Sequence, residues 1–207
     1  MHDKQAPQVI AICGIDGSGK TTLFERLRSD PGFQHAHFVR NRDNEILERV
    51  LRMNGPVDPM PDAYLQGPLA EAIRWAQAFD FLRHFETTLT PLLDSGHLLV
   101  SDRWSFCAIT CGDAGTAIGA QIASLLRHVP RPSLTIYLAV DEVTATERLL
   151  RRGPLLDDEH LEMLRAYGNA YEVFFRQYDG PLLRIPSVSA EETYQTVRDG
   201  IRARLGL

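Results

Sequence analysis

The sequence lacks the features that mark secreted, membrane-bound and nucleic-acid-binding proteins. Its three cysteines are an odd number without the spacing of a disulfide framework, which favours a reducing compartment. A net charge of −5 gives long nucleic acids and anionic membranes no general electrostatic attraction. No apolar run approaches the length of a membrane span, and the polar stretch from Met1 to Gln8 is unlike a signal peptide. We therefore expect a cytoplasmic protein that binds neither nucleic acid polymers nor membranes.

Two patterns that would indicate other chemistry are also missing. Cys107 and Cys111 are four residues apart and could share one face of a helix, but no pair of histidines stands nearby to complete a zinc site. We expect two small core or pocket side chains there instead. The base-reading segment N-K-x-D is absent as well, which argues against a GTPase.

Short apolar runs alternate with helical patterns along the chain. The runs that are typical of buried strands span residues 8–13, 33–40, 97–101, 133–140 and 182–185. Helices are expected at 20–29, 43–53, 69–93, 116–128, 141–151, 159–178 and 190–205, with a bend near Pro91 and a loop at 54–68. This alternation predicts an α/β fold with a parallel sheet. The length of 207 residues favours a single domain, 1–207.

A glycine-rich loop follows the first apolar run. Residues 14–21 read G-I-D-G-S-G-K-T and fit the phosphate-binding pattern G-x-x-x-x-G-K-[ST] between a strand and a helix. Glycines let the backbone approach a phosphate, and the N–H groups at the helix N-terminus face the anion. Lys20 would neutralise the β and γ phosphates, and Thr21 would hold Mg²⁺. The residues expected to bind the nucleotide are Gly14, Asp16, Gly17, Ser18, Gly19, Lys20, Thr21 and Thr22.

A polar pair, Asp102 and Arg103, directly follows the predicted strand at 97–101. In open parallel sheets, ligands bind beyond the carboxyl ends of the strands. Asp102 could hold the metal's water shell, and Arg103 could direct a bidentate donor at a transferred or acceptor phosphate. The alternative is a surface ion pair that caps the next segment. The phosphate-binding loop in the same sheet favours the functional interpretation.

Three arginines, Arg148, Arg151 and Arg152, end the predicted helix at 141–151 and enter a loop. Phosphoryl transfer needs positive charge on its transition state and a closed, dry site, and a mobile lid supplies both. Arg148 and Arg152 share one helix face and are the candidates, whereas Arg151 points elsewhere. We expect the lid at about residues 148–160. The alternative is a cationic helix C-terminus that favours the helix dipole.

Several of these segments resemble the thymidylate kinase family. Residues 14–22 resemble its G-x-D-G-x-G-K-T-T loop, in which the aspartate is more specific than a general phosphate-binding pattern. Residues 102–104 (D-R-W) resemble its D-R-Y, residues 132–141 resemble its P-D-L-T-x-Y-L-D-V-D strand, and residues 38–40 (F-V-R) resemble its F-P-R segment. Residues 147–153 resemble its lid. The likeness implies a P-loop kinase with a five-stranded sheet and helices on both faces, which uses ATP and Mg²⁺ and is often a homodimer.

The resemblance also implies roles for single side chains. Asp16 would touch the sugar or phosphate of the acceptor, and Arg40 and Arg103 would grip the acceptor phosphate. The residues that would act in catalysis are Asp16, Lys20, Arg103, Arg148 and Arg152, and those that would hold the metal are Thr21 and Asp102. The residues around the acceptor would be Arg40, Phe81, Asp102, Arg103, Ala108 and Cys111.

The chain departs from the family pattern on the acceptor side. Where the family has a D-R pair on the long helix, this chain has Asp80 and Phe81, so the arginine that stacks near thymine is a phenylalanine. Ala108 cannot hydrogen-bond a base edge as the family's polar residue does, and Cys111 replaces a tyrosine beside the sugar. Losing a polar reader of the base can remove strong discrimination between substrates.

Three interpretations therefore remain open from the sequence. The first is a nucleoside monophosphate kinase that phosphorylates dTMP or a related nucleotide. The second is a divergent kinase for another small molecule, such as a modified nucleotide or a metabolite hydroxyl. For a hydroxyl acceptor, Asp16 or Asp102 would be the base. The third is a nucleotide-binding protein without catalysis.

Overall fold

The structure covers most of the chain. The computed structural model describes residues 8–41, 45–54, 67–111, 117–155, 159–186 and 188–206. Most of the predicted loop at 54–68, part of the predicted lid (156–158) and the side chain of Cys111 lie outside the described residues.

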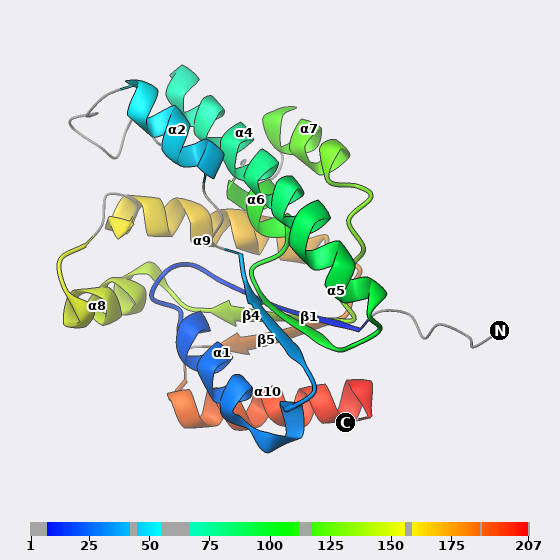
Figure 1. Ribbon diagram of the computed structural model, residues 1–207. Helices are drawn as coiled ribbons and strands as arrows, with labels where there is room; N and C mark the ends of the chain where they lie inside the picture. The colour runs from blue at the N-terminus through cyan, green and yellow to red at the C-terminus, as the bar shows by residue number, and fades with distance from the viewer. Residues whose placement is uncertain are drawn as a thin grey trace.

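Five parallel strands form one sheet in the order β2-β3-β1-β4-β5 (Figure 1). The strands are β1 (Val9–Cys13), β2 (His37–Arg40), β3 (Leu99–Asp102), β4 (Leu134–Ala139) and β5 (Leu182–Pro186). The central strand β1 reads V-I-A-I-C and is buried along its whole length, as expected where helices cover both faces. The predicted α/β fold with a five-stranded parallel sheet is confirmed.

One face of the sheet is covered by helices α1 (Lys20–Ser29) and α10 (Ala190–Leu205), which lie together in Figure 1. Side chains alternate along a strand, so Ile10 and Ile12 of β1 point to this face. They pack with Leu23 of α1 and with Val197 of α10 in one buried cluster. This packing fixes the start of α1 directly beyond the end of β1.

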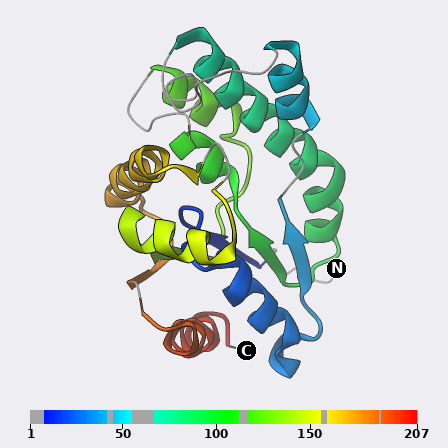
Figure 2. The same cartoon turned by 90° about the vertical axis from the view of Figure 1, so that its left-hand side faces the viewer.

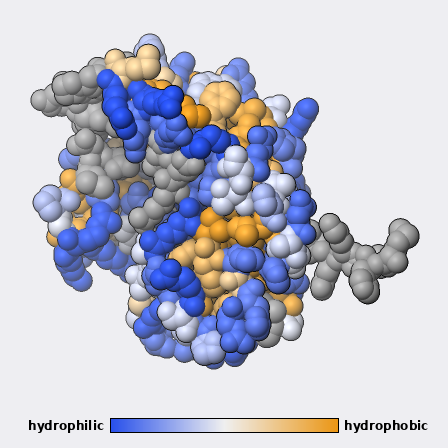
Figure 3. Space-filling view, in the orientation of Figure 1, coloured by the Kyte–Doolittle hydropathy of each residue, from blue (hydrophilic) through white to orange (hydrophobic). Residues whose placement is uncertain are grey.

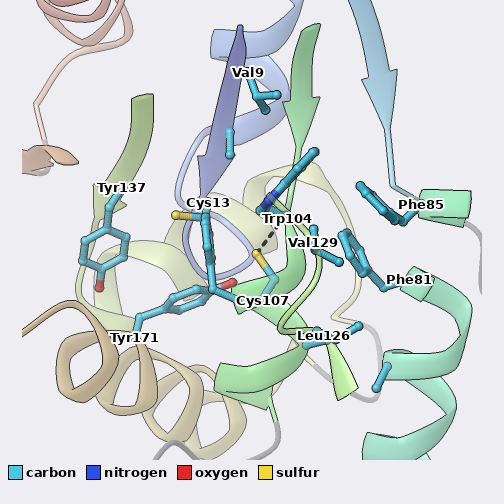
Figure 4. Close-up of a cluster of buried hydrophobic side chains, with 14 of the residues drawn as sticks. Val9, Cys13, Phe81, Phe85, Trp104, Cys107, Leu126, Val129, Tyr137 and Tyr171 are labelled. Carbon is cyan, nitrogen blue, oxygen red and sulfur yellow. Dashed lines mark hydrogen bonds between the residues drawn. The ribbon is translucent and has the colours of Figure 1, made fainter. Parts of the chain in front are cut away.

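The opposite face carries the remaining helices, as the side view in Figure 2 shows. They are α4 (Gly67–His84), α5 (Thr90–Asp94), α6 (Ser105–Cys111), α7 (Ala117–Leu125), α8 (Glu142–Arg152) and α9 (Leu161–Arg176), and α2 (Glu45–Asn54) packs on α4. In Figure 4, Phe81 and Phe85 point toward Trp104, while Tyr171 lies on the other side of Cys107. None of the helices in the described parts of the chain is long and apolar enough to cross a membrane.

Figure 3 shows the face of the molecule at which edge strand β2 lies in front. Hydrophilic side chains cover most of this face, and apolar ones gather around its middle. All four residues of β2 are half-buried, as expected for a strand with a neighbour on only one side.

The long helix predicted at 69–93 changes its winding before Pro91. Helix α4 continues into a π-helical segment, η2 (Phe85–Leu89), and then into α5. Because proline has no N–H to give to the preceding turn, the regular hydrogen-bond pattern ends here. The N–H of Thr90 instead donates to the carbonyl oxygen of Phe85, five residues back.

Asp80 connects α4 to α2. Its carboxylate is buried and accepts hydrogen bonds from the backbone N–H groups of Ile46 and Leu47, each at 2.9 Å. These two N–H groups belong to the first turn of α2, where no helical partner exists and a negative charge is favourable. The aspartate of the family's D-R pair therefore anchors a neighbouring helix in this chain.

Replacing Asp80 by alanine is expected to lower the free energy of unfolding by about 2–3 kcal/mol, because two N–H groups lose a charged acceptor. Urea unfolding measures this change. Glu71→Ala on the same helix is the control, since Glu71 is exposed. Equal effects of the two substitutions would contradict the anchoring role of Asp80.

Candidate active site

The phosphate-binding loop runs from the end of β1 to the start of α1, as predicted. Gly14 and Gly17 have positive φ angles of 142° and 78°. A Cβ atom on Gly14 would lie 2.7 Å from the carbonyl oxygen of Leu138, and one on Gly17 would lie 2.5 Å from the carbonyl oxygen of Ala145. Both glycines are therefore required by contacts with β4 and α8 as well as by backbone conformation.

Lys20 lies inside the loop with only 6% of its surface exposed. Its Nζ donates to the carbonyl oxygens of Gly14 and Ile15 at 2.9 and 2.8 Å, and to Oδ1 of Asp16 at 3.2 Å. Burial and the nearby charge of Arg103 lower the pKa of Lys20, while Asp16 and Asp102 oppose this shift. The ammonium group is thus held inside the glycine-rich loop.

Asp16 lies between two cations. Its Oδ1 accepts from Nη2 of Arg103 at 2.8 Å and from Lys20. Burial alone would raise the pKa of Asp16, but Arg103 and Lys20 outweigh it and hold the pKa well below its usual range. The three side chains come from the loop, from the start of α1 and from the end of β3. We call them the Asp16 cluster: Asp16, Lys20 and Arg103.

Asp102 ends β3 and is 5% exposed. Among the described residues, its Oδ1 has no hydrogen-bond partner although it is buried. Its charge acts on Lys20, and Thr21 stands exposed in the first turn of α1. No group of three metal-binding side chains occurs in the described parts of the chain. Magnesium is often bound through one or two protein groups, waters and phosphates, and the buried Oδ1 of Asp102 and the exposed Thr21 are side chains whose oxygen atoms suit such an ion.

Two arginines of α8 approach this centre. Nη1 of Arg148 lies 3.4 and 3.5 Å from the carbonyl oxygens of Gly17 and Ser18. Arg152 forms an ion pair with Glu159, and its charge contributes to the low pKa of Asp16. By contrast, the side chain of Arg151 is 80% exposed, as predicted.

Glu159 was not predicted from the sequence. It is 3% exposed and begins the segment that leads into α9. A single glutamate next to a loop carries no motif, and its pairing with Arg152 depends on how α8 and α9 pack together.

Arg40 lies at the end of β2, beside Asp102 in the sheet. Its side chain forms an ion pair with Glu25 of α1, and its guanidinium carbon is 5.2 Å from the centre of the Phe24 ring. Arg103 pairs with Asp16 instead. The two arginines thus form ion pairs with different carboxylates. That both bind the acceptor phosphate stays a prediction.

Two of the other predicted acceptor residues, Phe81 and Ala108, belong to the hydrophobic core. Phe81 and Ala108 are 2% and 6% exposed. The ring of Phe81 stacks on Phe85 and meets the edge of Trp104, with centroid distances of 6.3 and 6.0 Å. Trp104 is fixed by a hydrogen bond from its indole N–H to the carbonyl oxygen of Pro130 at 2.9 Å. Contacts of Phe81, Ala108 and Cys111 with an acceptor stay predictions.

A pocket of about 210 Å³ opens beside the phosphate-binding loop. Its walls come from the loop and α1, the end of β4, Arg148 of α8, and the connection from β5 to α10. The lining residues are Ser18, Gly19, Thr22, Leu23, Leu138, Val140, Arg148, Pro186, Val188, Ser189, Ala190 and Thr193. Sequence reasoning missed the wall after β5. The available signal was the capping box of Ser189 and Glu192, which marks the start of α10 there.

Comparison with known proteins agrees with these features. A family model described as thymidylate kinase matches residues 12–201. A probable thymidylate kinase of Pyrobaculum calidifontis is 31% identical over 167 residues, which cover 78% of this chain and 79% of that protein. A probable thymidylate kinase of Archaeoglobus fulgidus is 27% identical over 96% of this chain and 97% of its own length. A thymidylate kinase of Mycoplasma mobile is 24% identical over 93% and 94%.

The contact between Gly17 and α8 gives a stability prediction. Gly17→Ala should lower the free energy of unfolding and the affinity for ATP, because the new Cβ would collide with the backbone of Ala145. Gly96→Ala is the matched control, since Gly96 also has a φ of 78° and no atom within 4 Å of its Cβ position.

The left-handed conformation alone costs about 1–2 kcal/mol for either alanine. A clearly larger loss for Gly17→Ala in thermal or urea unfolding is therefore expected. Equal losses of unfolding free energy in the two variants would mean that the close approach of Gly17 to Ala145 does not affect stability.

Proposed function

The chain belongs to the thymidylate kinase family and is a nucleoside monophosphate kinase, and we propose that it phosphorylates dTMP through the Asp16 cluster. The observation that carries this proposal is the position of Asp16, which contacts both the loop lysine and the arginine at the end of β3. This cluster joins a donor-phosphate cradle to a guanidinium that can receive an acceptor phosphate. A phosphate acceptor is already ionised near neutral pH, so positioning and charge stabilisation matter more than a general base.

On the donor side, ATP would place its phosphates in the glycine-rich loop and its base in the neighbouring pocket. The pocket supports this assignment because it shares Ser18, Gly19 and Thr22 with the phosphate-binding segment. Its apolar walls at Leu138 and Val140 suit the face of a flat ring. Lys20 would exchange its bonds to the loop carbonyls for bonds to the donor phosphates.

Thr21 and Asp102 would hold Mg²⁺ at the donor phosphates. The buried, unpartnered Oδ1 of Asp102 supports this role. The ion would neutralise charge on the phosphates when bound. Asp102 would act through the metal's water shell, whereas Thr21 would use its hydroxyl.

The transferred group would pass in line from the donor to the acceptor phosphate. Arg103 would turn part of its hydrogen-bonding capacity from Asp16 to the acceptor, and Asp16 would keep the guanidinium aimed at the reaction centre. Arg148 and Arg152 would add positive charge from the lid, at about residues 148–160. The contacts of Arg148 at the loop carbonyls, which are long for hydrogen bonds, support its role on the donor side.

Three further proposals concern the location, the oligomeric state and the domain organisation of the enzyme. The free, buried thiols of Cys13 and Cys107 support a cytoplasmic location. A homodimer would remove apolar surface from water on the paired helices α2 and α4, where Met53 and Phe79 are 87% and 43% exposed. We also propose that residues 1–207 form a single domain.

The assignment is tested by ADP release with a panel of nucleoside monophosphates that begins with dTMP. Arg103→Ala should lower kcat/KM for the acceptor by about 10²–10³-fold, because a preorganised donor to the developing charge is lost. Arg131→Ala is the control, since Arg131 lies on the surface in an ion pair with Asp179. Its kcat/KM should stay unchanged.

Full activity of Arg103→Ala would refute the assignment of Arg103. Arg40→Ala separates the two arginines, because a large loss there would show that Arg40 leaves Glu25 to bind the acceptor. If no monophosphate in the panel supports ADP release, the proposed acceptor is wrong.

A further inference from the structure

Arg103 has an unusual backbone conformation. It is the one non-glycine residue with a positive φ in the described parts of the chain, at 76°. For a residue with a long side chain, this left-handed conformation is strained, and it persists only where the surroundings determine it. The side chain that it directs is the one that contacts Asp16.

Both backbone polar groups of Arg103 are held by neighbouring strands. Its N–H donates to the carbonyl oxygen of Ile12 in β1 at 2.8 Å. Its carbonyl oxygen accepts a hydrogen bond from the hydroxyl of Ser101 in β3, also at 2.8 Å. With Asp16 holding the guanidinium at 2.8 Å, the residue is fixed at three points.

Ser101 is an unexpected residue for its place in the sheet. It is 0% exposed, and its neighbours across the strands are Ala11 and Val39, which belong to the apolar cluster on this face. A buried hydroxyl is unfavourable unless it makes a hydrogen bond. Alanine would fill the position without a polar group, so packing does not explain the serine. The hydrogen bond to the carbonyl oxygen of Arg103 explains why a hydroxyl is present here.

We propose that Ser101 is a positioning residue that holds the Arg103 backbone in its left-handed conformation and so aims the guanidinium at the acceptor phosphate. This inference rests on the proposed function of Arg103. The hydroxyl touches neither substrate nor metal and acts through the peptide group of Arg103. Without it, the carbonyl can turn, φ can relax to negative values, and the guanidinium leaves Asp16.

The test compares Ser101→Ala with Ser133→Ala. Ser133 is the matched control, because it is half-buried just before β4 and its hydroxyl also bonds a backbone group, accepting from the N–H of Val9 at 3.2 Å. That bond lies at the end of the sheet away from the site. Steady-state kinetics with ATP and dTMP measures kcat and both KM values, and urea unfolding measures the stability of each variant.

Ser101→Ala should lower kcat about tenfold, because a misplaced catalytic group loses rate more than binding. The KM for ATP should stay within twofold, since the donor cradle is untouched. Ser133→Ala should keep kcat within twofold. A kcat for Ser101→Ala within twofold of the wild type would overturn the proposal, and so would an equal loss in both variants.

A crystal structure of the Ser101→Ala variant gives a readout that needs no activity. The expected result is a negative φ at residue 103 or a guanidinium beyond hydrogen-bond distance of Asp16. An unchanged Arg103 would overturn the proposal. If the wild type itself fails to phosphorylate dTMP, the proposed function fails, while this structure still decides whether Ser101 holds Arg103.

Discussion

The ion pair between Asp16 and Arg103 is the contact on which the site depends. It joins the phosphate-binding loop after β1 to the end of β3, two segments that are 87 residues apart in the chain. Because Oδ1 of Asp16 also contacts Lys20, one carboxylate sets the position of two cations. The two cations stabilise the ionised carboxylate against the effect of burial, which is why the pKa of Asp16 is held well below its usual range. The carboxylate in turn offsets the repulsion between the two cations. In the proposed mechanism, the donor and acceptor sides thus share the charge of Asp16.

The conformation of the loop that contains Asp16 is constrained by neighbouring elements as well as by its own sequence. Gly14 leaves no room for a side chain beside β4, and Gly17 leaves none beside α8. Helix α8 therefore rests directly on the loop and brings Arg148 to its carbonyl oxygens. Arg148 also lines the pocket beside the loop.

At two positions predicted to lie near the acceptor, Phe81 and Ala108, the side chains pack in the apolar core. Phe81 fills the core against Phe85 and Trp104, where the family pattern has an arginine beside the base. Its neighbour Asp80 turns to the first turn of α2 and anchors that helix. One D-F pair thus contributes its aspartate to the helix framework and its phenylalanine to the core. Both side chains of this pair therefore have structural roles in the described part of the chain.

Local patterns in the sequence predicted the five strands and most of the helices, although not α6. They also predicted the phosphate-binding loop with its lysine, and Asp102 and Arg103 at a strand end. These follow from local patterns, because apolar runs, glycine spacing and a strand-to-helix turn are all short-range properties. Tertiary structure alone decided the partners: Glu25 for Arg40, Glu159 for Arg152, Ser101 for the carbonyl of Arg103, and the pocket wall after β5. Most of these contacts depend on sheet register and helix packing, and the bond from Ser101 depends on the backbone turn at Arg103. A pattern of single residues contains neither.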